Sequence, residues 1–113
     1  MLTVSIAQIE DLSKAALRPG AVVVDAQDGF AQPAFQRGLP EAIAAARENG
    51  TASLAIGHAH TCTSLGYFTA QIAREGLIAF GMTNATPVVA PPGGSKRVIG
   101  TNPMSFSVPD GQG

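Results

Sequence analysis

Both histidines and the only cysteine of the chain lie in one short segment, "AIGHAHTCTSLGYF", residues 55–68. His58, His60 and Cys62 alternate, so they could share one face of an extended segment and bind a metal ion. Zinc prefers three or four ligands, and no second Cys/His cluster completes this set. Cys62 could instead act as a nucleophile with His60 as its base, although a lone cysteine is more often a small buried residue.

A third interpretation uses the hydroxyl groups of the same segment. Thr61, Thr63 and Ser64 could cap the helix that follows and offer hydroxyl and backbone N–H donors to an anion. Helix N-termini attract phosphate and carboxylate through their unpaired N–H groups and their dipole. Plain N-capping without a ligand would use the same residues. Spacing alone leaves these alternatives open.

The segment "APPGGSKRVIGTNP" is the second region of interest. Its glycine pair would allow a ligand to approach the backbone closely. It is not a Walker loop, because no "GK[ST]" follows the glycines, and the G-x-G-x-x-G fingerprint is absent from the chain. A long surface loop between two strands explains the composition equally well. Any nicotinamide nucleotide would therefore be held by something other than a Rossmann turn.

Alternating strands and helices must position these residues. The apolar, partly β-branched runs at 21–26, 51–57 and 77–84 predict buried strands. Helical patterns cover 33–49 and 65–75, and this order is typical of an α/β fold with right-handed crossovers and a parallel sheet.

Local signals refine these elements. Gly50 suits the C-terminal cap of the first of these helices, whereas Gly38 and Pro40 should kink or interrupt it. Beyond the third strand, "MSFSVP" alternates like a short strand with one buried face. Four apolar residues share a face of a further helix near the N-terminus, namely Ile6, Ile9, Leu12 and Ala16. The expected organisation is an N-terminal helix at 1–17 and an α/β domain at 18–113.

Polar residues follow each of the three predicted strands. They are "DAQDGF", "HAHTCTS" and "TNATP", and ligands of α/β sheets gather beyond the carboxyl ends of the strands. A binding site is therefore expected where these turns meet, without its ligand being identified.

Composition limits the class of protein. At 113 residues, 45% of them apolar, the chain is at most one ordinary globular domain. A formal net charge of −1 indicates no excess of positive charge that would attract nucleic acid or an anionic membrane. One cysteine excludes an internal disulfide framework, and no leader or membrane-spanning run is evident, so we expect a cytoplasmic protein.

Five segments in order resemble the malate/L-lactate dehydrogenase family: "VVDAQDGFAQPAF", "GLPEAI", "LGYFTAQIAREGLIAFGMTN", "VVAPPGG" and "IGTNPMSFSVP". "GTNP" followed by an alternating strand is the most specific of them. The resemblance implies a partial non-Rossmann α/β sheet, with strands alternating with helices, that binds NAD or NADP. It also implies hydride transfer to or from a 2-oxo acid, a 2-hydroxy acid or a cyclic 2-imino acid, in a homodimer. No metal site is expected, because the possible ligands of segment 55–68 lack a second cluster.

The resemblance also assigns roles to residues. His60 is the candidate acid/base, since an imidazole can exchange protons near neutral pH; a structural or cofactor-contacting role is its alternative. Thr101 and Asn102 of "GTNP" are candidates for substrate binding. The candidates for cofactor binding are His60, Thr61, Cys62, Thr63, Ser64, Leu65, Asn84 and Ala85.

The family's "SHG" segment, which carries a histidine, is missing between the first predicted helix and the strand "AVVVDA". Two hypotheses follow. The chain is a fragment or internally deleted form of an oxidoreductase, or it is a vestigial, inactive chain that acts only by association with a full-length relative. Unpaired strand edges and uncovered apolar faces predict self-association or poor solubility in either case.

Overall fold

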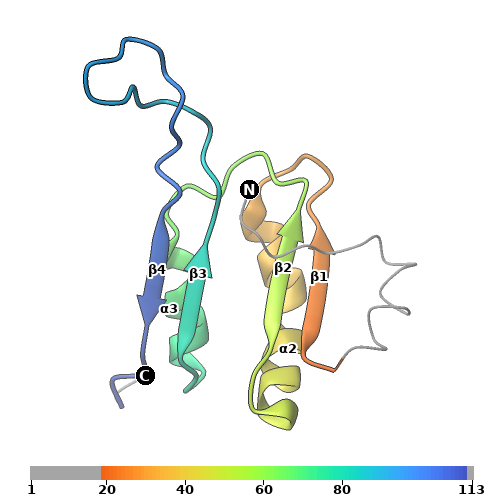
Figure 1. Ribbon diagram of the computed structural model, residues 1–113. Helices are drawn as coiled ribbons and strands as arrows, with labels where there is room; N and C mark the ends of the chain where they lie inside the picture. The colour runs from red at the N-terminus through yellow and green to blue at the C-terminus, as the bar shows by residue number, and fades with distance from the viewer. Residues whose placement is uncertain (1–18, 112–113) are drawn as a thin grey trace.

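The computed structural model describes residues 19–111, so the helix expected at 1–17 lies outside the described residues. Strands and helices alternate along the chain, as an α/β fold requires (Figure 1). The elements are β1 Ala21–Asp25, α2 Ala31–Asn49, β2 Ser53–Gly57, α3 Gly66–Arg74, β3 Ala79–Met82 and β4 Met104–Ser107.

The first two strands form the parallel unit that the sequence predicted. β1 pairs with β2 in parallel, and Val22 and Val24 lie opposite Leu54 and Ile56. Helix α2 connects the two strands and packs on them. Val22 and Val24 are buried whereas Val23 is half-buried, so β1 is fully covered on one face only.

The expected single sheet of three parallel strands is wrong. β3 pairs with β4 in an antiparallel ladder, and the described strands form two separate two-stranded sheets. β2 and β3 are not hydrogen-bonded to each other. Leu54 of β2 and Ala79 of β3 instead line one apolar cavity. Periodicity reports that a segment is extended, but it does not specify which edge the segment pairs with.

Helix α2 runs through Gly38 and Pro40, so the predicted interruption there is wrong, whereas a kink at these residues stays a prediction. Proline removes one backbone hydrogen bond, but residues on both sides of it are buried on the same face, including Phe35 and Ile43. This packing retains the helix across the proline. Gly50 ends it in the left-handed conformation at φ 79°, which confirms the predicted cap.

The core joins the two units through their helices. Leu65 and Phe68 are buried on one face of α3, and Ile72 packs against the same cluster, as the periodicity predicted. The ring of Phe68 meets that of Phe35 edge to face, with centroids 5.0 Å apart. This contact links α2 to α3.

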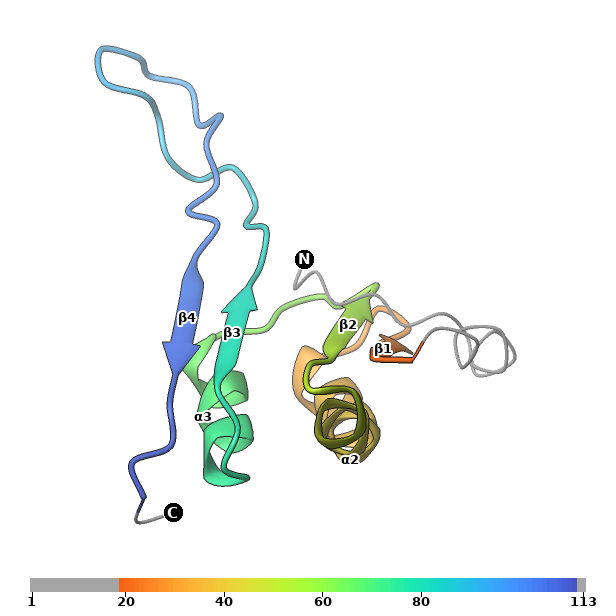
Figure 2. The same cartoon turned by 60° about the horizontal axis from the view of Figure 1, so that its bottom comes forward.

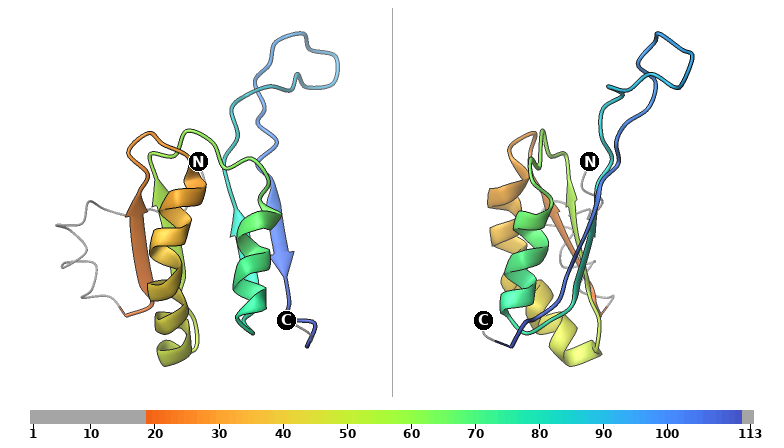
Figure 3. Two further views of the ribbon diagram at one scale, coloured as in Figure 1. Left: turned by 180° about the vertical axis from the view of Figure 1, so that it is seen from behind. Right: turned by 90° about the vertical axis from the view of Figure 1, so that its left-hand side faces the viewer.

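Both helices cover the same side of the strands (Figure 3). On β4 the half-buried residues are Ser105 and Ser107, while Met104 and Phe106 are exposed on the other face. Between β3 and β4 the chain forms a long arm, residues 83–103, that extends away from the rest of the molecule (Figure 2). The arm is closed by an antiparallel bridge between Val89 and Ile99.

Candidate functional site

The turns that follow β1 and β2 are joined by backbone hydrogen bonds. Asp28 N–H donates to the carbonyl of His58 at 2.7 Å, and His60 N–H donates to that of Gly29 at 2.8 Å. The first helical residue, Ala31, donates to the carbonyl of Thr61 at 3.1 Å. The segment with both histidines is therefore held against the start of α2, at the carboxyl ends of the two strands.

Asp25 and His58 form a polar pair at this edge. The carboxylate Oδ1 lies 3.1 Å from Nδ1 of His58 and accepts the backbone N–H of Gln27 at 2.8 Å. The Gln27 hydrogen bond, more than His58, holds the pKa of Asp25 below its ordinary value. The side chain of Asp25 is 16% exposed and that of His58 73%, so the imidazole remains open to solvent.

Gln32 is a residue that the sequence analysis missed. Its amide Nε2 donates to the carbonyl of Cys62 at 3.2 Å and to the hydroxyl of Thr63 at 3.0 Å. Its other amide atom, Oε1, is buried without a hydrogen-bond partner among the described residues. The only available signal was its place one residue into the helix that follows the "DAQDGF" turn.

The predicted side-chain capping of α3 is wrong. The N-cap residue is Leu65, and no side chain caps the helix. The hydroxyl of Thr61 instead accepts the backbone N–H of Thr63 at 3.3 Å, within the turn, and the Ser64 carbonyl accepts Tyr67 N–H. The first turn of α3 carries no acidic residue. Its N-terminus therefore keeps its positive dipole end free of a competing carboxylate.

The remaining predicted residues of this segment differ in exposure. The side chain of His60 is exposed, and its backbone N–H donates to the carbonyl of Gly29. Cys62 is a half-buried free thiol that packs against the core. Leu65 is buried within the core.

A second group of predicted residues lies at the base of the arm. Ala85 N–H donates to the side-chain oxygen Oδ1 of Asn102 at 2.8 Å. Gly100 passes so close to the Ala85 carbonyl that a Cβ would have no room, which explains the glycine of "GTNP". Thr101 is exposed, and Asn84 lies on the opposite limb of the arm.

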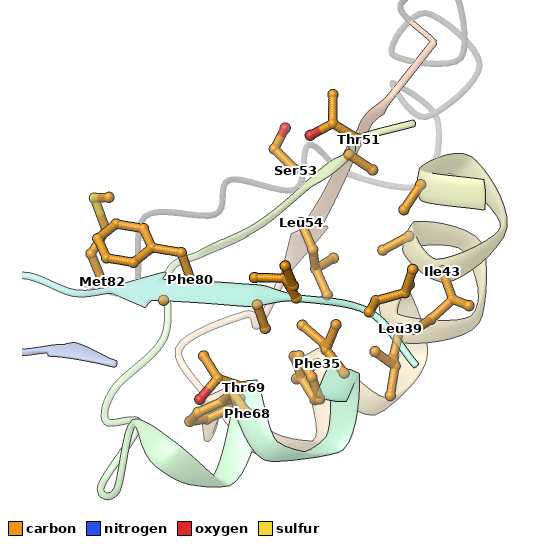
Figure 4. Close-up of a pocket in the computed structure, with 18 of the residues that line it drawn as sticks. Phe35, Leu39, Ile43, Thr51, Ser53, Leu54, Phe68, Thr69, Phe80 and Met82 are labelled. Atoms are coloured by element: carbon orange, nitrogen blue, oxygen red, sulfur yellow. The ribbon is translucent and has the colours of Figure 1, made fainter. Parts of the chain in front are cut away.

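The predicted residues therefore form two hydrogen-bonded groups near the same end of the strands (Figure 1). The apolar cavity of about 510 Å³ between the two units is elsewhere (Figure 4). Its lining includes Phe35, Leu54 and Phe68 and no charged side chain. Leu65 is the one predicted site residue in that lining, so this cavity does not offer a site for phosphate groups.

Residues 19–111 contain neither a metal-binding cluster nor a membrane-spanning helix. No group of three or more His, Cys, Asp or Glu side chains there could hold a metal ion, so His58, His60 and Cys62 do not gather into the set considered from sequence. Within the same range, no helix has the length and apolar character needed to cross a membrane.

The chain resembles known proteins over most of its length. The family described as malate/L-lactate dehydrogenase matches residues 5–113. A (2R)-3-sulfolactate dehydrogenase (NADP(+)) of Chromohalobacter salexigens is 44% identical over 91 residues, 80% of this chain and 27% of the relative. A malate dehydrogenase of Pyrococcus abyssi is 35% identical, with 80% of this chain and 25% of the relative covered. A Δ1-pyrroline-2-carboxylate reductase of Burkholderia ambifaria is 39% identical, with 82% and 27% covered.

The chain spans about a quarter of the length of these relatives. No solved structure matches it.

Proposed function

Because the chain belongs to the malate/L-lactate dehydrogenase family, we propose that it forms part of an NAD(P)-dependent oxidoreductase. The reaction is hydride transfer between the nicotinamide and a 2-oxo acid, a 2-hydroxy acid or a cyclic 2-imino acid. This range of substrates is supported by three relatives: a sulfolactate dehydrogenase, a malate dehydrogenase and a pyrroline-2-carboxylate reductase. They differ in substrate, so the proposal extends to the class and not to one acid.

The observation that carries the proposal is that backbone hydrogen bonds join the turn after β1 to the turn after β2. This connection holds Thr61, Thr63 and Ser64 immediately before a helix N-terminus that has no acidic residue in its first turn. Hydroxyl groups, backbone N–H groups and the positive end of a helix are the donors that suit a phosphate group. The residues present therefore fit the anionic part of a nicotinamide nucleotide, with Cys62 and Leu65 in the same turn and His60 beside it.

The nicotinamide, when bound, supplies or accepts the hydride. Asn84 and Ala85 are proposed to lie near it, and Thr101 to meet the substrate carboxylate through its hydroxyl. Asn102 holds Ala85 N–H through its side-chain oxygen, which fixes one limb of the arm against the other. Asn102 thus orients this end of the site as well as being a candidate contact for substrate.

His60 is the proposed acid/base residue. Its exposed side chain can reach a ligand placed over the joined turns, and reduction of a C=O or C=N group requires a proton besides the hydride. His58 differs because its Nδ1 faces the carboxylate of Asp25. The two histidines can therefore be compared by mutation, because the side chain of His58 is held by Asp25 whereas that of His60 is exposed.

The same proposal includes a homodimer and a cytoplasmic location, both of which stay predictions. The alternative is an inactive chain that acts only beside a full-length relative. Nucleotide binding and turnover separate the two possibilities, because a vestigial chain can retain the first without the second.

Nucleotide binding is tested by titrating NADH and NADPH into the purified chain and following the fluorescence of the reduced nicotinamide. The chain contains no tryptophan, so the signal is free of tryptophan energy transfer. We expect saturable binding of one nucleotide. Replacing Thr61 and Thr63 by valine should weaken it roughly tenfold or more, since hydrogen bonds to charged groups are worth about 1.5–3 kcal/mol.

Thr51→Val is the matched control, because Thr51 precedes β2 and lies at the opposite end of that strand from the joined turns. Its affinity should equal that of the wild type. If neither nucleotide binds, the cofactor proposal is wrong for this chain. If one binds and no 2-oxo or cyclic imino acid is reduced, the vestigial alternative holds; if reduction occurs, His60→Gln should abolish it while His58→Gln retains it.

A further inference from the structure

Gln32 links helix α2 to the turn that precedes α3. Its amide Nε2 donates to the backbone carbonyl of Cys62 at 3.2 Å and to the hydroxyl of Thr63 at 3.0 Å. The main chain makes a parallel connection, because Ala31 N–H donates to the carbonyl of Thr61 at 3.1 Å. The turn is therefore already attached to α2 through its backbone, and Gln32 adds a side-chain contact that ends on one hydroxyl group.

The acceptors of Gln32 fix the orientation of its amide. A backbone carbonyl can only accept a hydrogen bond, so the amide group that faces Cys62 must be the NH₂. The same NH₂ donates to Thr63 Oγ1 and occupies one lone pair of that hydroxyl. A hydroxyl also has one proton to donate, and that of Thr63 has no acceptor among residues 19–111. Because Thr63 is exposed, this proton is available to a ligand.

Thr63 also has a backbone conformation that its side chain disfavours. Five described residues other than glycine have a positive φ, and Thr63, at 56°, is the β-branched one among them. Such a conformation persists only where surrounding contacts fix it. The contacts here are the Gln32 amide on the Thr63 hydroxyl and the Thr61 hydroxyl, which accepts Thr63 N–H at 3.3 Å. Gln32 thus helps to determine where the Thr63 hydroxyl lies.

The second amide atom of Gln32 destabilises the fold. Oε1 is buried and has no hydrogen-bond partner within the described part of the chain. A buried acceptor without a partner is unfavourable, and a methionine of similar length would avoid it. Local rules of this kind are broken mainly at functional sites. The benefit of the amide therefore lies in what Nε2 does to Thr63.

We propose that Gln32 is a positioning residue of the nucleotide site. By donating to Thr63 Oγ1, it leaves the hydroxyl proton of Thr63 free to bind a phosphate oxygen of the nucleotide, while Gln32 itself does not touch the phosphate. The inference rests on the proposed function, because it concerns the same site. It adds the residue that sets the hydrogen-bond polarity of one donor there.

Gln32→Met tests the inference, since methionine keeps the length of the side chain and removes both amide atoms. In titrations with NADH and NADPH, the dissociation constant of the nucleotide that binds should rise at least roughly fivefold, because the Thr63 hydroxyl loses the bond that orients it. The melting temperature should not fall, because the buried acceptor is removed together with the amide. A glutamine with a merely structural role would lower the melting temperature when replaced.

Gln36→Met is the matched control. Gln36 lies one turn further along α2, and its amide donates to the hydroxyl of Tyr67 and to Oε1 of Gln71. Both partners lie within α3, beyond the turn that contains Thr63. The change removes the same kind of amide from the same helix and should leave nucleotide affinity unchanged.

Two further measurements show whether Gln32 acts through Thr63. Gln32→Glu should weaken binding more than Gln32→Met, because a carboxylate accepts the Thr63 proton and repels the phosphate. In a Thr63→Val background, Gln32→Met should change the dissociation constant by less than roughly twofold, because the hydroxyl on which it acts is absent.

Several outcomes would overturn the inference while nucleotide binding, and with it the proposed function, stands. They are wild-type affinity in Gln32→Met or Gln32→Glu, an equal loss in Gln36→Met, a full effect of Gln32→Met beside Thr63→Val, and a lower melting temperature of Gln32→Met. A wild type that binds neither nucleotide would overturn both the inference and the cofactor proposal.

Discussion

Asp25 is the residue whose charge the fold controls most clearly. Its carboxylate accepts the Gln27 backbone N–H and faces Nδ1 of His58, and its pKa is lowered from the ordinary 3.8, chiefly by the Gln27 hydrogen bond. A lowered pKa means that the ionised form is preferred in the folded state. The associated stability is therefore present above the unfolded pKa and is lost as the pH falls through the folded one.

We expect the melting temperature of the wild type to fall as the pH is lowered below about 4, the range in which Asp25 takes up a proton. Asp25→Asn should lose part of this dependence while retaining the fall caused by other carboxyls. Thermal unfolding followed by circular dichroism between neutral and acid pH measures it. Asp28→Asn, which removes the neighbouring carboxylate, is the control; an Asp25→Asn profile identical to that of the wild type would contradict the expectation.

At the scale of elements, Thr69 of α3 makes two hydroxyl contacts with β4 of its sheet. The Thr69 hydroxyl lies 2.7 Å from the Ser105 hydroxyl and accepts that of Ser107 at 2.8 Å, and Thr69 is 2% exposed. The close approach of α3 also requires Gly81, because a Cβ there would lie 2.9 Å from the Thr69 methyl group. A small, polar inner face is thus what turns the apolar side chains of the hairpin outward.

Thr69→Val keeps the shape of the side chain but leaves Ser105 and Ser107 without their partner. We expect a loss of about 0.5–1.5 kcal/mol in the free energy of unfolding, the usual worth of a hydrogen bond, because the two serine hydroxyls that lose their partner are only half-buried. Adding Ser105→Ala and Ser107→Ala to Thr69→Val should recover part of that loss, because no orphaned group then remains. Urea denaturation compares the variants, and a triple variant less stable than Thr69→Val would contradict this account.

At the scale of the whole molecule, two strand–helix units are held together by α2 and α3. Phe35 and Phe68 meet edge to face, and Arg47 near the end of α2 donates to the backbone carbonyl of Glu75 at 3.1 Å. The Arg47–Glu75 ion pair is largely exposed, so it adds little. The apolar contact therefore provides most of the coupling between the units.

Phe35→Ala should cost about 3–5 kcal/mol, the usual loss for a buried aromatic ring. A chain of this size has a total stability of only about 5–15 kcal/mol, so the variant should be largely unfolded near body temperature. Phe30→Ala removes an exposed ring of the same kind and should leave the melting curve unchanged. A cooperative, wild-type-like transition for Phe35→Ala would show that the two units do not depend on this contact.

Local sequence signals predicted where the described strands and helices lie, but not the continuity of α2 through Pro40 or the uncapped start of α3. The helices end where Gly50 and Gly76 allow a left-handed residue, and Leu65, Phe68 and Ile72 face the core as their spacing predicts. These features depend on contacts between residues close in sequence. The segment 55–68, which holds both histidines and the cysteine, was singled out for the same reason, since its residue types are visible in the chain itself.

Only the tertiary structure decided how these elements combine. β3 pairs with β4 and not with β2, Asp25 and not Cys62 is the partner of a histidine, and Gln32 holds the turn that contains Thr63. Each of these is a contact between residues far apart in sequence, and several partners of similar chemistry were available for each. Hydrophobic period and side-chain type limit such partners to a class, whereas the packing of the folded chain selects one of them.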